Sequence, residues 1–225
     1  MGNEEVPQGT AGEPAAKAKA PRRTPEQQDQ EIQNYINEAR QSIQQALETP
    51  VTQTLLFPLG FSPARLAEGL TLADAAITTF AARQQAIGEE SQSVAAAGVA
   101  LITAQSGLVR FREAVRIATP DKTIQTALGI TGRVPKDGEK FLTAMQATLR
   151  TAQQAPYAVL VASVGYDAPA LAALAALGDS FATARRQSTE AQARAKAATA
   201  KRNEAVKALR VFTTPFYRAL RLVGN

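Results

Sequence analysis

The sequence predicts an all-α protein, an antiparallel helical bundle with two long, coiled-coil-like helices that arose by internal duplication. Three observations predict it: apolar residues recur at three- and four-residue steps, no segment alternates as a strand would, and the chain matches itself when shifted by 105 residues. About 45% of the residues are hydrophobic but only 5% are aromatic, and much of the hydrophobic share is alanine. Such a composition favours long helices packed closely around a thin core.

The first helix is expected to begin at Pro25, because Thr24 is a good N-cap and proline is tolerated at the first helical position. Its apolar face consists of Ile32, Tyr35, Ile36, Ala39, Ile43, Ala46 and Leu47. Pro50 ends the helix, and the apolar segment after it, interrupted by a proline and by Gly60, is predicted to form a short helical turn and a corner. Residues 1–24 carry almost no large apolar side chain and are predicted to form a disordered tail.

A second, much longer helix is predicted to begin at Ser62-Pro63 and to extend to Ala118, over about 84 Å. Its apolar residues at seven-residue spacing are Leu66, Ala73, Phe80, Ile87, Val94, Leu101, Leu108 and Val115. This spacing indicates coiled-coil-like packing with a left-handed supercoil. Three glycines, Gly88, Gly98 and Gly107, lie in the second half of this helix or near its middle. They mark either the close approach of another helix or a break into two helices.

The stretch 119–137 is predicted to be a linker with one short helix, which Thr119 caps and Gly129 stops. A helix over about 138–154 follows. After a further proline, a last long helix is expected from about Pro169 to Val223.

The duplication is visible in the two corners, because a shift of 105 residues places Gly60 on Gly165 and Phe61 on Tyr166. Further matches are Leu55 with Leu160, Leu66 with Leu171, Leu72 with Leu177, Phe111 with Phe216, and Arg116 with Arg221. The shift equals fifteen heptads, so the alternative is chance register between two alanine-rich helices. The corner and the helix endings lie outside the alanine-rich middle and still match, which favours duplication. The predicted divisions are a disordered tail (1–24), a first helical unit (25–118), the linker (119–137) and a second helical unit (138–225).

Several segments together resemble a family of uncharacterised bacterial helical proteins. They are FPLGFSPARLAEGLTL, VASVGYDAPALAALAAL, RFREAVRIA, PFYRALRLV and TALGITGR. The resemblance covers most of residues 30–225 and implies a two-unit helical bundle. It implies no activity, ligand or site.

The residue types present argue against an enzyme. The chain has no cysteine and no histidine, so disulfides, thiolate metal sites and the commonest general base near neutral pH are excluded. No catalytic residue, cofactor site or metal site is therefore predicted. Asp74 and Asp179 match under the 105-residue shift and form either a carboxylate pair or, as we favour, two surface acids near helix starts. A two-metal site in a bundle uses Glu-x-x-His motifs, which need histidine.

Charge is unevenly distributed along the chain, whose net charge is +5. Residues 185–221 hold ten basic and two acidic residues, whereas the matching stretch 80–116 holds four and three. The candidate anion- or partner-binding residues are Arg185, Arg186, Arg194, Lys196, Lys201, Arg202, Lys207 and Arg210. They form either a binding stripe for nucleic acid or another anionic partner, or a solvated face that pairs at most with acids of a neighbouring subunit. No aromatic residue for base stacking occurs in 182–211, which weakens the nucleic-acid alternative.

Together these observations favour a non-catalytic structural or assembly protein that acts through helix–helix contacts. The expected partner is a second copy of the chain or another helical protein, since long helices leave apolar faces uncovered. The second hypothesis is a basic binding module for nucleic acid or an anionic surface. The chain shows no secretory signal and no run of eighteen apolar residues, so a cytoplasmic protein without a membrane span is expected.

Overall fold

The computed structural model of the protein describes residues 24–224. Its elements are α1 (Pro25–Glu48), α2 (Pro50–Leu56), the 3₁₀ turn η1 (Phe57–Leu59), α3 (Pro63–Ala118), α4 (Lys122–Ala127), α5 (Gly138–Ala152), α6 (Tyr157–Ser163) and α7 (Ala168–Val223). Of the described residues 87% are helical and none lies in a strand, which confirms the predicted all-α class. The expected tail lies, except for Thr24, outside the described residues.

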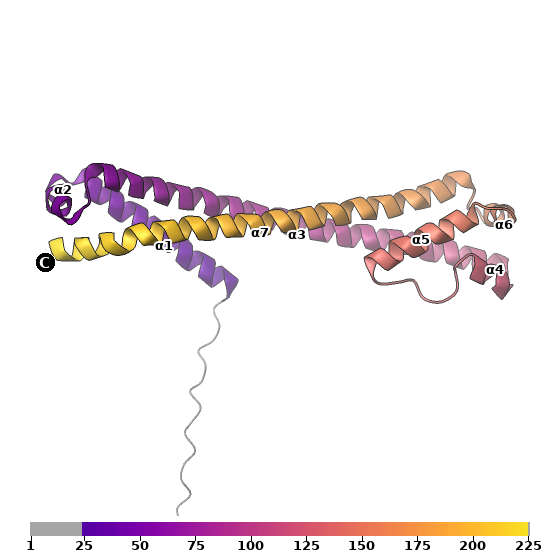
Figure 1. The fold of residues 1–225 in the computed structure, drawn as a ribbon. Coiled ribbons are helices and arrows are strands. Elements are labelled where there is room, and N and C mark those ends of the chain that lie inside the picture. The colour runs from indigo at the N-terminus through magenta and orange to yellow at the C-terminus, as the bar shows by residue number, and fades with distance from the viewer. Residues whose placement is uncertain (1–23, 225) are drawn as a thin grey trace, which may run out of the picture.

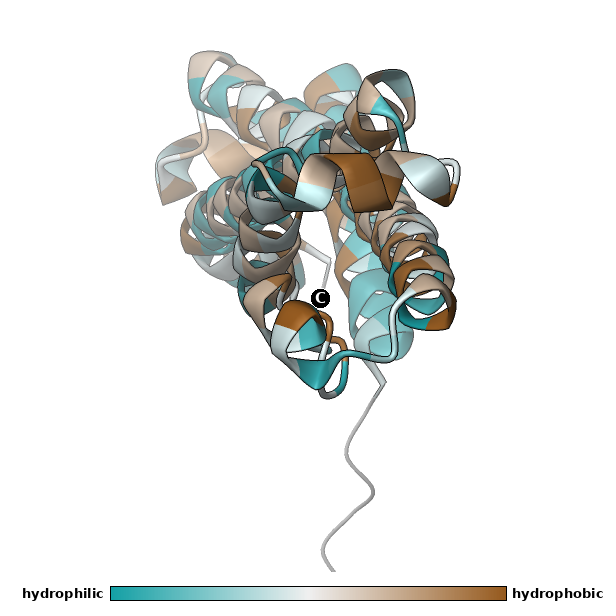
Figure 2. Cartoon of the chain, turned by 90° about the vertical axis from the view of Figure 1, so that its right-hand side faces the viewer, coloured by the Kyte–Doolittle hydropathy of each residue, from teal (hydrophilic) through white to brown (hydrophobic). Residues whose placement is uncertain are grey.

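The molecule is a rod in which α3 and α7, each of 56 residues, lie side by side along its whole length (Figure 1). The two helices run in opposite directions, because Gly69 near the start of α3 faces Phe212 near the end of α7, and Gly107 faces Leu174. The shorter helices gather at the two ends: α1 and α2 at one, α4, α5 and α6 at the other. The apolar α6 crosses its end of the rod and meets α7 at a bend of 92° (Figure 2).

Side-chain caps explain where the long helices begin. The Ser62 hydroxyl accepts a hydrogen bond from the Arg65 amide at 3.2 Å, and the Asp167 carboxylate accepts one from the Ala170 amide at 3.0 Å. The helix α3 continues through Gly88, Gly98 and Gly107, so it is one helix and not two. The prediction for α4 was wrong at its start: Asp121, not Thr119, is the cap.

The cap of α4 moved because a carboxylate two positions further on is the better acceptor. Asp121 accepts a hydrogen bond from the Thr123 amide at 2.7 Å. Thr119 instead ends α3, where its own amide donates to the carbonyl of Val115 at 3.0 Å.

Both corners have the same backbone geometry. Gly60 and Gly165 adopt left-handed conformations with φ of 87° and 85°, which cost glycine little. At the first corner the Phe61 amide donates to the carbonyl of Leu56 at 3.2 Å and the Gly60 amide donates to the carbonyl of Phe57 at 3.0 Å. These two bonds form a Schellman motif. The equivalent bonds at the second corner run from Tyr166 to Val161 and from Gly165 to Ala162.

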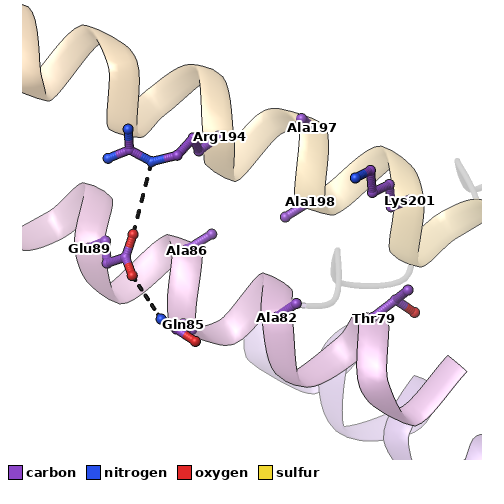
Figure 3. A pocket seen from close by; sticks show the side chains of 9 residues that line it. All are labelled: Thr79, Ala82, Gln85, Ala86, Glu89, Arg194, Ala197, Ala198 and Lys201. Atoms are coloured by element: carbon purple, nitrogen blue, oxygen red, sulfur yellow. Dashed lines mark hydrogen bonds and ion pairs between the residues drawn. The ribbon is translucent and has the colours of Figure 1, made fainter. Parts of the chain in front are cut away.

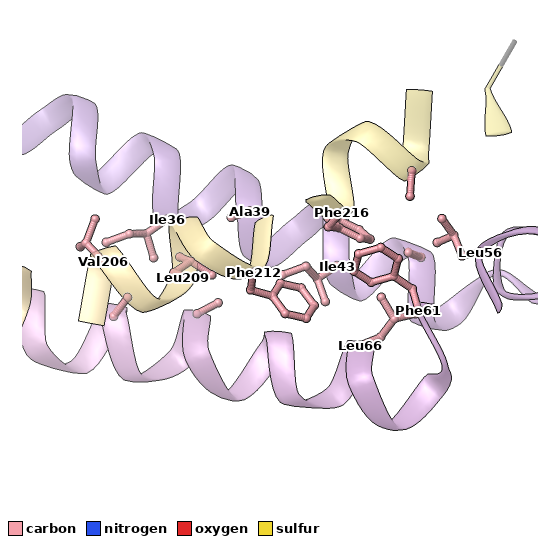
Figure 4. Close-up of a cluster of buried hydrophobic side chains, with 14 of the residues drawn as sticks. Ile36, Ala39, Ile43, Leu56, Phe61, Leu66, Val206, Leu209, Phe212 and Phe216 are labelled. Carbon is pink, nitrogen blue, oxygen red and sulfur yellow. The ribbon is translucent and has the colours of Figure 1, made fainter. Parts of the chain in front are cut away.

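The buried core is divided between the two ends of the rod. One cluster joins α1, α2, the start of α3 and the end of α7 around Phe61, Phe212 and Phe216 (Figure 4). The other joins the end of α3, the linker, α5, α6 and the start of α7. Between them lies a stretch that we call the waist, residues 89–103 of α3 and 186–200 of α7. In the waist the buried residues of α7 are small, namely Ser188, Ala191 and Ala195, and α3 buries none.

Packing contacts recur with the 105-residue shift. The rings of Phe61 and Phe216 pack edge to face with centroids 5.5 Å apart, and those of Phe111 and Tyr166 do so at 5.0 Å. Under the shift Phe61 corresponds to Tyr166 and Phe111 corresponds to Phe216, so the two ring contacts are equivalent. Gly69 likewise corresponds to Leu174 and Gly107 to Phe212, so the contact of Gly69 with Phe212 is equivalent to that of Gly107 with Leu174.

Candidate interaction surfaces

Of the eight basic residues singled out on α7, seven are exposed and one, Arg202, is buried. Two of the exposed ones form ion pairs within the chain, Arg185 with Glu139 at 3.4 Å and Arg194 with Glu89 at 4.0 Å. Such exposed pairs contribute little to stability. A third, Arg210, places its guanidinium 5.4 Å from the centre of the Tyr35 ring. The remaining exposed residues are Arg186, Lys196, Lys201 and Lys207.

Arg202 belongs to a largely buried cluster of three charges, not to the solvent-exposed stripe. Its Nη1 lies 3.3 Å from Asp29 Oδ1, and Arg83 Nη1 lies 2.5 Å from Asp29 Oδ2. Burial lowers the pKa of Arg202, and the nearby charge of Arg83 lowers it further. An arginine begins with so high a pKa that it stays charged, so two guanidinium groups share one carboxylate here and the three side chains together keep a net charge of +1. The cluster therefore links α1 to both long helices.

Sequence reasoning missed the role of Asp29, although heptad spacing contains a signal for it. Asp29 lies seven residues before the buried Ile36, and Arg202 lies seven residues before the buried Leu209. Charged residues at core positions of two helices are candidates for a buried pair. The sequence alone does not say which of the many opposite charges meets them, because that depends on how α1 is placed along α3.

A second pair of arginines fixes the linker to the end of α3. Arg112 is buried and donates from Nη2 to the carbonyl oxygen of Gly129 at 2.5 Å, while Arg116 donates to the carbonyl of Ile130. Burial lowers the pKa of Arg112, with a smaller lowering from the charge of Arg116. The two side chains replace the solvent that the linker carbonyls would otherwise bind, so their role is structural.

At the middle of the rod, α3 and α7 enclose a shallow groove of about 380 Å³ (Figure 3). Its floor consists of Ala82, Ala86, Ala197 and Ala198, with Glu89, Arg194 and Lys201 among the side chains at its edges. Glu89 and Arg194, which form an ion pair at 4.0 Å, occupy matching positions under the 105-residue shift.

The two aspartates that match under the shift lie at opposite ends of the rod. Asp74 pairs with Arg40 of α1 at 2.7 Å, whereas Asp179 lines a groove beside α5. Within residues 24–224 no group of three or more acidic side chains is placed to hold a metal ion.

The most distinctive exposed surface is a stripe on the outer face of α3. It consists of Ala95, Val99, Ile102, Ser106 and Val109, at successive spacings of four, three, four and three residues. All five are exposed, and Val99 and Ile102 each expose 65% of their surface. No charged residue occurs between Glu90 and Arg110. Figure 1 shows α3 and α7 alone between the start of α1 and the start of α5, so no third described helix covers the waist part of this stripe.

By length and composition α3 also passes as a helix that could cross a membrane, with 17% of its most apolar window buried. It is the one such single helix in the described part of the chain, and α6 with α7 passes only as a bent pair. The core helix of a water-soluble protein meets the same criterion. The expectation of a chain without a membrane span therefore stays a prediction.

Comparison of the chain with protein-family models, with curated proteins and with solved structures found no match. The fold is a two-helix rod with shorter helices at each end.

Proposed function

We propose that this protein is a non-catalytic structural or assembly protein that self-associates through the exposed stripe on α3. The observation that carries the proposal is the four-three spacing of Ala95, Val99, Ile102, Ser106 and Val109 on a face without charge. That spacing is the one that packs helices into coiled coils. In α3 it is present twice: once toward α7, within the chain, and once toward solvent.

A second copy of the same chain is the occupant that the charges favour. The α3 stripe carries no charge between Glu90 and Arg110, so two copies can bring their stripes together without repulsion. The exposed face of α7 is basic and would repel its own copy. A contact along 19 residues of one helix is at the low end of stable interfaces, so association should depend on protein concentration.

The proposal includes an internal duplication that produced an antiparallel bundle of two equivalent units. Its support is the recurrence of the corner geometry, of the ring pairs and of the glycine contacts at one constant shift of 105 residues. Chance register between two helices would not repeat the φ values of Gly60 and Gly165, which lie outside the long helices.

Light scattering at several protein concentrations tests the self-association. We expect the molar mass to rise above that of one chain and to persist at high salt, because the contact is apolar. The double substitution Val99→Ser with Ile102→Ser should return the protein to one chain. Val211→Ser, at an equally exposed apolar residue of α7, is the matched control. A monomer at every concentration, or equal association of both variants, would overturn the proposal.

The exposed side chains of Lys196, Lys201 and Lys207 favour one alternative, a basic surface for nucleic acid. Changing these three lysines to Gln leaves the buried Arg202 in place, so the fold should be kept. Duplex binding at physiological salt that falls steeply with salt, and that this variant loses, would make the alternative the better proposal. We expect no such binding, because no aromatic side chain lies among these lysines.

A further inference from the structure

A second apolar surface lies at the end of the rod formed by α2 and η1. It consists of Val51, Leu55, Phe57 and Leu59, which are between 41% and 69% exposed. We call it the apolar tip. Leu222 in the last turn of α7, at the same end, is also 72% exposed. Single exposed apolar residues are ordinary on protein surfaces, but four within nine residues form a patch that indicates a binding surface.

The apolar tip is held rigidly in its outward position. Its neighbour Leu56 is fully buried, and Phe61 packs edge to face on Phe212 and Phe216 at centroid distances of 5.9 and 5.5 Å (Figure 4). The Schellman bonds at Gly60 fix the backbone between these anchors. Phe57 and Leu59 therefore cannot turn inward without breaking the first core cluster.

At the other end of the rod, the linker covers the equivalent corner. There the linker residues Leu128 and Ile130 are fully buried in the second core cluster, and α6 buries Val161. Among the large apolar side chains of residues 24–224, only Val159 of α6 and Ile117 of α3 are strongly exposed at that end. No described segment lies over the apolar tip in the way that the linker lies over its counterpart.

The charges around the apolar tip have a positive excess, with three exposed arginines against the exposed Glu48 and Glu68. No acidic residue occurs from 49 to 67, between Glu48 and Glu68. Three exposed arginines lie at this end: Arg65 in the first turn of α3, and Arg218 and Arg221 in the last turns of α7. A second copy docked tip to tip would bring like charges together, which disfavours it.

We propose that the apolar tip docks on an anionic lipid bilayer. Apolar side chains on a rigid end, Phe57 and Leu59 foremost, enter the boundary between headgroups and acyl chains, and the arginines meet the anionic headgroups. Each basic residue near such a surface adds attraction, and long arginine side chains reach the headgroup level while their stems remain apolar. The rod then stands on the bilayer by one end, which leaves the α3 stripe free for another copy. This inference does not depend on the proposed self-association.

Co-sedimentation with vesicles tests the proposal. The full chain should bind vesicles of phosphatidylcholine with phosphatidylglycerol, and bind vesicles of phosphatidylcholine alone far more weakly. The double substitution Phe57→Ser with Leu59→Ser should lower the partition coefficient at least about tenfold, because the two apolar side chains that enter the bilayer are lost. Ile117→Ser with Val159→Ser, at the other end of the rod, is the matched control and should bind as the native chain does.

The electrostatic part has its own variant, Arg218→Gln with Arg221→Gln. We expect a loss of about fivefold for each arginine at low salt, and a smaller loss at high salt. The control Arg150→Gln, at an exposed residue of α5, should change vesicle binding little. A circular dichroism spectrum like that of the native chain shows that each variant folds.

Three results would overturn the proposal. One is no binding to either kind of vesicle. Another is equal binding to neutral and anionic vesicles that salt does not reverse, which would point to insertion of α3 instead. The third is an equal loss of binding in the Ile117 and Val159 variant, which would mean that the two ends do not differ.

Discussion

Asp29 joins three helices at one point, because its carboxylate meets Arg83 of α3 and Arg202 of α7 from its place in α1. The two guanidinium groups are 12% and 7% exposed, so most of their hydration is lost. Breaking a buried pair costs more than the pair contributes, because the remaining charge is left without a counterion.

Asp29→Asn should therefore destabilise the protein by about 3 kcal/mol. The matched control is Asp74→Asn, which removes an ion pair with Arg40 that is about half exposed, and should cost less than about 1 kcal/mol. Urea unfolding followed by circular dichroism measures both. Equal losses in the two variants would show that the Asp29 cluster does not stabilise the fold as a buried pair does.

The glycines of α3 differ in what surrounds them. A Cβ at Gly69 would lie 2.3 Å from two ring carbons of Phe212, a ring already packed on Phe61, whereas a Cβ at Gly98 would meet nothing within 4 Å. Gly69→Ala should thus cost about 1–3 kcal/mol through overpacking. Gly98→Ala should stabilise the helix by about 0.5–1 kcal/mol. Thermal unfolding measures both, and a stabilising Gly69→Ala would contradict the close approach of α3 and α7.

At the scale of the elements, the local rules of helix formation predict most boundaries. Thr24, Ser62 and the glycine corners act on their nearest neighbours, so their effect is legible in the sequence. The cap of α4 was the exception, because two acceptors, Thr119 and Asp121, compete over three positions. The placement of α1 and α5 on the long helices was not predicted, since it depends on contacts between residues far apart in the chain.

The waist should be the least protected part of both long helices. It lies between the two core clusters, and its buried residues are small, so local opening loses little buried area. Hydrogen exchange followed by mass spectrometry should show faster exchange at 89–103 and 186–200 than in the segments on either side. Slowest exchange in the waist, in a sample dilute enough to be monomeric, would mean that the central packing is tighter than the burial indicates.

At the scale of the whole molecule, the sequence predicts the helical class and the two long helices, because apolar periodicity can be recognised without knowing which residues are in contact. It does not predict the second stripe on α3. Val99 and Ile102 were not among the residues at seven-residue spacing, and only the course of α7 shows that they face away from it. Nor does it separate the buried Arg202 from the exposed lysines beside it, since both lie in one basic run.

Cysteine crosslinking tests the central claim, self-association through the α3 stripe, most directly, because the chain has no native cysteine to compete. Ile102→Cys places one thiol in the stripe, and Val211→Cys places one on an equally exposed site of α7. On mild oxidation the Ile102→Cys protein should form a disulfide-linked dimer of two chains at concentrations where Val211→Cys stays monomeric. Equal crosslinking of both variants, or none at Ile102→Cys when light scattering shows a dimer, would contradict the stripe as the contact.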